Sequence, residues 1–182
     1  MKSKNAAMEM SIGTIVTIVL LMSVLILGIF LIQKIGGVAR GAIDLTEKQL
    51  YTELNKLYAD DEDQRIILYP QTSILEIKKG KSDGFGLLIN NRLETDESFS
   101  YEITLADKGT CTMTEEQIMD LITLGKERSD INLASGSVLS NPLRINFAIP
   151  ETAKLCQVLY RLEVTTSDGE SYDGIDLLLT IK

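Results

Sequence analysis

The hydrophobic pattern begins with a long apolar run near the N-terminus. From Ile12 to Ile32, 21 consecutive residues carry no charge. As a helix rising about 1.5 Å per residue, this run extends over roughly the 30 Å thickness of a membrane's hydrocarbon core. It therefore predicts a transmembrane helix over residues 12–33, preceded by a short leader or cytoplasmic segment at 1–11. The alternatives are a helix buried in a soluble core and a secretory signal cleaved near residues 37–39.

Residues 34–62 predict an amphipathic stalk helix followed by an acidic joint. Asp44 and Glu47 have the spacing of a capping box, which marks the start of a helix. Apolar residues then fall on one helical face, at Leu50, Leu54, Leu57 and Tyr58. This stripe must be buried, either against the domain that follows or against other copies of the chain. The acidic run 60–63 lacks the glycine turn and distal Glu of an EF-hand loop, so we interpret it as a solvated joint, with weak calcium binding as the alternative.

From residue 63 to residue 182, apolar and polar positions alternate with the period of β-strands. Seven short strands in about 120 residues are typical of an immunoglobulin-like sandwich. A second capping-box spacing, Thr114 to Gln117, predicts one short helical insertion. The expected core residues are Phe99, Tyr101, Ile103, Phe147, Val158, Tyr160, Leu162, Leu177 and Leu179. The predicted fold class is therefore α+β: an N-terminal transmembrane and stalk helix, then an all-β antiparallel immunoglobulin-like sandwich with one helical insertion.

Charge and composition narrow the classes of function. The chain has 18 basic and 26 acidic side chains and no His. An acidic body argues against a nucleic-acid partner, because that partner requires a basic face. Without His, the commonest general base and metal ligand is missing. The sequence also lacks the nucleotide-binding, nucleophile-elbow and zinc-protease motifs. We therefore expect no catalytic, cofactor-binding or metal-binding residues, and an anchored enzyme that uses carboxylates is the least favoured hypothesis.

The only two cysteines are Cys111 and Cys156. In an oxidising compartment, a bond between them would close a loop of about 46 residues and remove about 4 kcal/mol of unfolded-state entropy on the chain-entropy model. The alternative is a pair of buried thiols that pack as small apolar groups. We predict the disulfide.

Charge alone leaves the orientation of the apolar run nearly undecided. Lys2 and Lys4 precede it, and Lys34 and Arg40 follow it, so the positive-inside rule gives almost equal weight to both sides. The acidic, cysteine-containing β-domain favours an outside location for the C-terminal part. We therefore expect a single-pass protein in the lipid bilayer of the cell membrane, with a cytoplasmic N-terminus and an extracytoplasmic domain, or else a surface filament.

The stretch from Lys4 to Ser11, which runs directly into the apolar segment, resembles the start of archaeal type IV pilin-like proteins with a class III signal peptide. The resemblance implies removal of the leader after Lys4 by a prepilin-peptidase-like enzyme, so that Asn5 becomes the first residue and Glu9 the fifth. The family usually has Gly or Ala before the cut and often Gln after it, where this chain has Lys4 and Asn5. The resemblance also implies that Glu9 pairs with the N-terminal amine of a neighbouring subunit. Alternatively, Glu9 lies in the interfacial region near the positive end of the helix dipole.

Two functions follow as expectations. The first is a non-enzymatic, membrane-anchored cell-surface protein that forms a pilin-like filament by self-assembly through its N-terminal helix. The second is a permanently anchored single-span envelope protein whose immunoglobulin-like domain binds a ligand or partner. The fold alone does not separate them, because sandwich domains support many functions.

Overall fold

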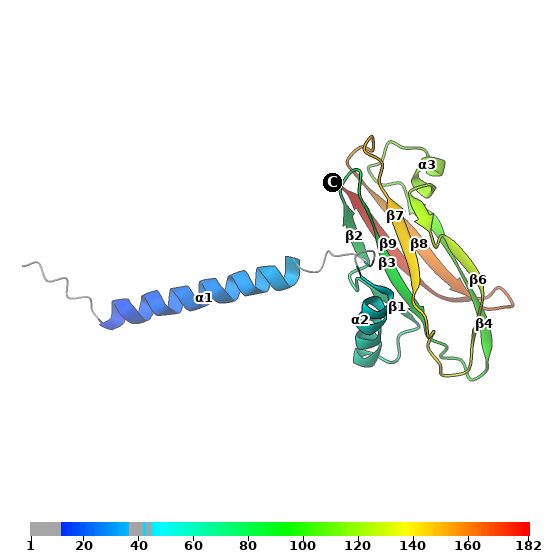
Figure 1. The fold of residues 1–182 in the computed structure, drawn as a ribbon, viewed down its shortest axis with the longest axis horizontal. Helices are drawn as coiled ribbons and strands as arrows, with labels where there is room; N and C mark the ends of the chain where they lie inside the picture. The colour runs from blue at the N-terminus through cyan, green and yellow to red at the C-terminus, as the bar shows by residue number, and fades with distance from the viewer. Residues whose placement is uncertain (1–11, 37–41, 43–44) are drawn as a thin grey trace, which may run out of the picture. The chain divides into compact units, whose positions relative to one another are not determined.

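The computed structural model describes residues 12–36, 42 and 45–182. The chain forms two compact units, Met1–Val38 and Ala39–Lys182. In the first unit, helix α1 extends over Ile12–Gly36 (Figure 1). Its side chains are described over residues 14–29.

The first unit corrects the membrane prediction. A membrane span requires about 20 consecutive apolar residues in one helix. Across residues 12–36, 42 and 45–182, no helix has both the length and the apolar character that crossing a membrane demands. The predicted transmembrane helix at 12–33 is therefore wrong on this finding, and so is the single-pass location with a cytoplasmic N-terminus and an extracytoplasmic domain.

The second unit is a sandwich of two β-sheets (Figure 1). The four-stranded sheet has the order β1-β3-β7-β5, and the five-stranded sheet has the order β2-β9-β8-β4-β6. The strands are β1 (Ile66–Tyr69), β2 (Ile74–Ile77), β3 (Ser82–Ile89), β4 (Glu97–Asp107), β5 (Ile122–Leu124), β6 (Glu127–Leu133), β7 (Leu143–Ala148), β8 (Cys156–Thr165) and β9 (Ser171–Ile181). Strand β2 pairs with β9 in parallel, whereas the other neighbours are antiparallel.

The predicted fold class is therefore corrected in two further respects. The described chain is mostly β, with nine strands instead of seven, and its larger sheet is mixed instead of antiparallel. The disulfide of an immunoglobulin domain joins its two sheets. Here Cys156 begins β8, and Cys111 lies in the loop after β4. Strands β4 and β8 are neighbours in the same sheet, so this disulfide does not join the two sheets as an immunoglobulin disulfide does.

Alternating apolar residues make the core of the sandwich, as the period predicts. In β7, Leu143, Ile145 and Phe147 are buried, and the residues between them are half-exposed. Three large rings from three strands meet in this core: Phe147 lies 6.1 Å from Phe85 and 5.3 Å from Tyr160, between ring centroids. All nine predicted core residues are buried, which confirms that part of the prediction.

Helix α2 (Glu47–Asp60) packs on the outer face of the four-stranded sheet. Its buried residues Leu50 and Leu54 contact the outward side chains of the sheet in a second, smaller apolar cluster. The sheet carries Gly86 at this contact, where a Cβ would lie only 2.4 Å from the Leu50 Cδ1 atom. The predicted apolar stripe is therefore buried against its own domain, on a helix that begins at Glu47 and ends at Asp60.

Capping boxes begin both helices of this unit. Thr46 and Gln49 cap α2, so the expected box at Asp44 and Glu47 is wrong by two positions, and Asp44 lies outside the described residues. Helix α3 (Glu115–Met119) begins with the predicted box of Thr114 and Gln117. Its buried Ile118 closes one end of the sandwich core, where the Ile118 carbonyl accepts a hydrogen bond from the Tyr160 hydroxyl at 2.8 Å.

The predicted disulfide is confirmed. Cys111 and Cys156 are bonded, and their Cα atoms are 4.9 Å apart. Both residues are buried beside the sandwich core. The bond ties the loop before α3 to the start of β8.

Candidate functional site

Helix α1 carries the first candidate surface, which we call the apolar helix surface and define as the side chains of residues 14–29. Apart from Thr14, Thr17, Ser23 and Gly28, every residue in it is a large aliphatic or Met. The described large side chains are exposed on all sides of the helix, with Leu20 60% and Ile26 65% exposed. The Ser23 hydroxyl donates to the Val19 carbonyl at 2.8 Å within the helix. A helix that is apolar all round is normally buried by neighbours on every side.

The head, residues 45–182, has few large apolar side chains on its surface. They are Tyr51 on α2, Ile74 on β2, Leu124 on β5 and Leu155 before β8. They lie on four different elements, and single exposed apolar residues are normal on a protein surface. The head therefore folds around its own core and presents mainly polar side chains.

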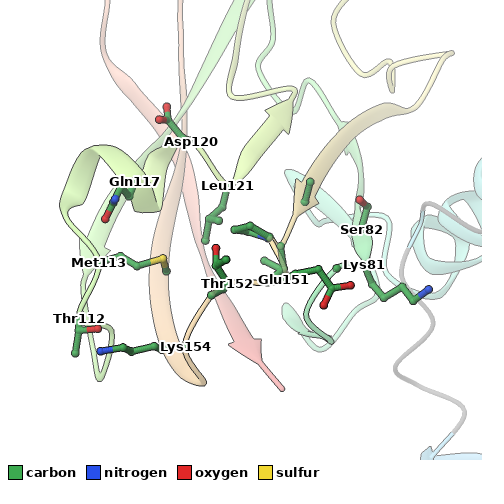
Figure 2. Close-up of a pocket in the computed structure, with 15 residues that line it drawn as sticks. Lys81, Ser82, Thr112, Met113, Gln117, Asp120, Leu121, Glu151, Thr152 and Lys154 are labelled. Atoms are coloured by element: carbon green, nitrogen blue, oxygen red, sulfur yellow. The ribbon is translucent and has the colours of Figure 1, made fainter.

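A cleft of about 740 Å³ opens at the end of the sandwich that carries α3 (Figure 2). Its walls are the turn before β3, the loop after β7, and the segment that contains α3. Met113, Leu121 and Thr152 point into the space between these walls, whereas Lys81 and Lys154 point away from each other (Figure 2). The disulfide is close to this cleft in sequence. Thr112, which follows Cys111, and Ala153, three residues before Cys156, both line the cleft.

The cleft has an amphipathic lining and two carboxylates. Asp120 follows α3, and Glu151 belongs to the loop after β7. The two side chains point in different directions (Figure 2). Acid–base catalysis by a carboxylate pair requires both groups to face one reacting bond. The two carboxylates of the cleft therefore do not face one common point (Figure 2).

The opposite end of the head is strongly acidic, and we call it the acidic end. It comprises nine carboxylates and two arginines: Asp60, Asp61, Glu62, Asp63, Glu94, Asp96, Glu97, Asp168 and Glu170, with Arg65 and Arg92. Interactions between loops hold it together, including an ion pair between Arg92 and Asp63 and a bond from the Ser135 N–H to Asp96 at 2.9 Å. Over the described ranges, no group of three or more His, Cys, Asp or Glu residues is arranged to hold a metal ion.

Hydrogen bonds shift two carboxyl groups at the acidic end. The Ser167 hydroxyl donates to Glu97 at 2.6 Å and, with the N–H groups of Ser98 and Ser167, lowers the pKa of Glu97 below its usual value of 4.5. The Thr166 hydroxyl donates to Asp168 at 2.6 Å and likewise lowers the pKa of that carboxyl group. Both groups are therefore held in their charged form, with their charge directed to the surface.

The structure places only part of the predicted site. Cys111 and Cys156 come together as expected. Lys4, Asn5 and Glu9 lie outside the described residues, so the cleavage site and the assembly role of Glu9 stay predictions. Sequence reasoning missed the cleft, because its walls come from segments 80–82, 112–121 and 148–154 that only the fold brings together.

Comparisons with known proteins give no family. No protein-family model matches this chain, and no curated protein matches it. Among solved structures, a family 123 glycoside hydrolase from Clostridium perfringens is 14% identical, with a TM-score of 0.39, over 71% of this chain and 25% of that chain. This chain thus spans about a quarter of that enzyme. At this TM-score, the likeness supports no inference.

Two further solved structures match at similar levels. A Niemann-Pick type C2 protein from the Japanese carpenter ant is 10% identical, with a TM-score of 0.38, over 65% of this chain and 90% of that chain. MyfA, the major subunit of Myf fimbriae from Yersinia enterocolitica, is 9% identical, with a TM-score of 0.29, over 57% of this chain and 85% of that chain. These scores are likewise too low to support an argument about function.

Proposed function

We propose that this protein is a self-assembling, non-enzymatic filament subunit whose α1 helices bundle with those of other copies. The observation that carries the proposal is the apolar helix surface, which is exposed around the whole circumference of α1. A single partner helix covers one face of another helix, because packed helices lie 8–10 Å apart along one line of contact. Several neighbouring helices are therefore needed to cover all of it, and a bundle of many copies provides them.

The structure of the head agrees with a bundle that is formed by α1 alone. It has its own apolar core, its surface is mostly polar, and its helix α2 is already packed on the sheet through Leu50 and Leu54. In the proposed filament, α1 alone forms the central bundle, and the heads face outward. The resemblance to archaeal type IV pilin-like proteins adds a leader cut between Lys4 and Asn5 and a pairing of Glu9 with the N-terminal amine of a neighbour.

The proposal is tested with two charges placed in α1. Full-length protein is kept monomeric in mild detergent. The detergent is then removed, and filaments are counted by electron microscopy. Wild-type chains should form filaments, and the double variant Leu21→Lys with Leu25→Lys should form at least tenfold fewer, because each buried charge in an apolar bundle is costly unless it is paired. The matched control, Leu124→Lys with Leu155→Lys, changes two exposed head residues and should assemble like the wild type.

Two results would contradict the proposal. One is a wild-type chain that stays monomeric after the detergent is removed, and the other is an α1 variant that assembles as well as the wild type. The cleft beside α3 favours a second function, the binding of a ligand or partner by the head. A monomeric chain would favour that second function.

A further inference from the structure

Four lysines gather at the end of the head opposite the acidic end, and we call them the lysine turn. Lys78, Lys79 and Lys81 lie in the turn between β2 and β3, and Lys182 directly follows β9. The Lys79 N–H donates to the Lys182 carbonyl at 3.0 Å, and the Lys182 N–H donates to the Ile77 carbonyl at 2.9 Å. All four lysines are exposed. Two carboxylates lie close by, because Glu76 pairs with Lys182 at 2.6 Å and Glu151 lies against Gly80.

Strand β9 connects the two charged ends of the head. It begins at Ser171, directly after the hairpin that carries Asp168 and Glu170, and ends at Ile181, which pairs with Ile77 before the lysine turn. The 11 residues of β9 span about 35 Å at about 3.3 Å per residue. Charges interact over only about 10 Å in 0.1 M salt. The lysine turn and the acidic end therefore do not neutralise each other within one chain.

We propose that the lysine turn of one copy binds the acidic end of the next copy, so that the heads contact each other end to end. The occupant is a second copy because the same chain carries the complementary surface: nine carboxylates against two arginines at one end, and four exposed lysines against Glu76 and Glu151 at the lysine turn. This inference rests on the proposed self-assembly through α1, since exposed ion pairs are individually weak. Once α1 holds the chains together, each head is at a high effective concentration near the next head, so weak ion pairs between heads can form in larger numbers.

A charge exchange tests this contact in full-length protein. The variant Lys78→Glu with Lys79→Glu should reduce filament number at least fivefold in 0.1 M salt, and so should Asp60→Lys with Glu62→Lys. The two pairs combined should restore assembly to within twofold of the wild type, because each like-charge contact becomes an attractive one again. The control, Lys48→Glu with Lys126→Glu, makes the same charge change as the first variant at exposed lysines elsewhere and should leave filament number unchanged.

The outcomes separate this inference from the bundling of α1. If wild-type chains assemble and the lysine-turn variant assembles equally well, the end-to-end contact is wrong and the bundle stands. If both single-end variants fail and the combined variant also fails, the ends bind something other than each other, such as an anionic polymer at the lysine turn, and the inference is overturned. If wild-type chains do not assemble at all, the proposed function falls and the end-to-end contact falls with it.

Discussion

Tyr172 on β9 connects two other segments of the acidic end, one at residues 63–65 and one at residues 90–92. Its hydroxyl donates to the Asn90 carbonyl at 2.7 Å and accepts the Arg92 N–H at 2.9 Å. Its carbonyl accepts a bond from Arg65, whose guanidinium carbon lies 4.9 Å from the centre of the Tyr172 ring. Arg92 in turn pairs with Asp63 in the acidic joint. A single buried side chain thus fixes loops that carry most of the acidic charge.

Replacing Tyr172 with Phe should destabilise the head by about 1–3 kcal/mol, because the buried Asn90 carbonyl and the Arg92 N–H would each lose a partner. Urea unfolding followed by circular dichroism would measure this change. The control is Tyr51→Phe, since Tyr51 lies on the surface of α2. An unfolding midpoint for Tyr172→Phe equal to that of the control would contradict the role of the hydroxyl.

Glu97 makes stability depend on pH. Its pKa is lowered in the folded state, chiefly by the Ser167 hydroxyl. The folded chain therefore binds fewer protons than the unfolded chain, so the stabilising contribution is present above the usual pKa of 4.5 and is lost as pH falls through the folded pKa. The stability difference between wild type and Glu97→Gln should be larger at about pH 6 than at about pH 3, as measured by urea unfolding. An equal difference at both pH values would rule out this linkage.

At the scale of elements, the disulfide ties the loop after β4 to the start of β8. Its two cysteines are 45 residues apart in sequence, and closing a loop of this length lowers the entropy of the unfolded chain. The bond also holds the cleft wall at residues 112–113 near the loop after β7. Stability and cleft geometry therefore depend on the same bond.

Replacing both cysteines with Ser should lower the free energy of unfolding by about 4 kcal/mol on the chain-entropy model. Unfolding in urea without reductant would measure the loss. Reduction of the wild-type protein should produce a similar loss and should leave the double variant unchanged. A double variant as stable as the oxidised wild type would contradict this account.

The sequence predicts those features that local pattern determines. Alternation predicted the buried face of the strands, and the Thr114–Gln117 spacing predicted α3. Prediction from the local pattern failed where two capping-box spacings overlap, and where strands far apart in the sequence pair with each other. Two overlapping capping spacings precede α2, and the fold uses Thr46. The parallel pairing of the four-residue strand β2 with β9 joins segments about a hundred residues apart, which no local period encodes.

At the scale of the whole molecule, the two compact units have opposite surface chemistry. The apolar helix surface of α1 is exposed and uncharged, whereas the head is charged at both ends. A long uncharged run predicted a membrane span, and the structure does not support that reading. The proposed self-assembly assigns the bundling to α1 and leaves the head as a separately folded unit.

Cross-linking between copies measures whether the α1 helices of different chains contact each other. Both native cysteines are already bonded, so a single cysteine added to α1 reports only on its neighbours. Leu25→Cys and Leu27→Cys place a thiol on nearly opposite sides of the helix, since successive residues turn by about 100°. If α1 helices bundle, assembled protein of both variants should give disulfide-linked dimers on a non-reducing gel, and the head variant Ser129→Cys should give none. Cross-linking at only one of the two α1 positions, or at neither, would contradict the bundle.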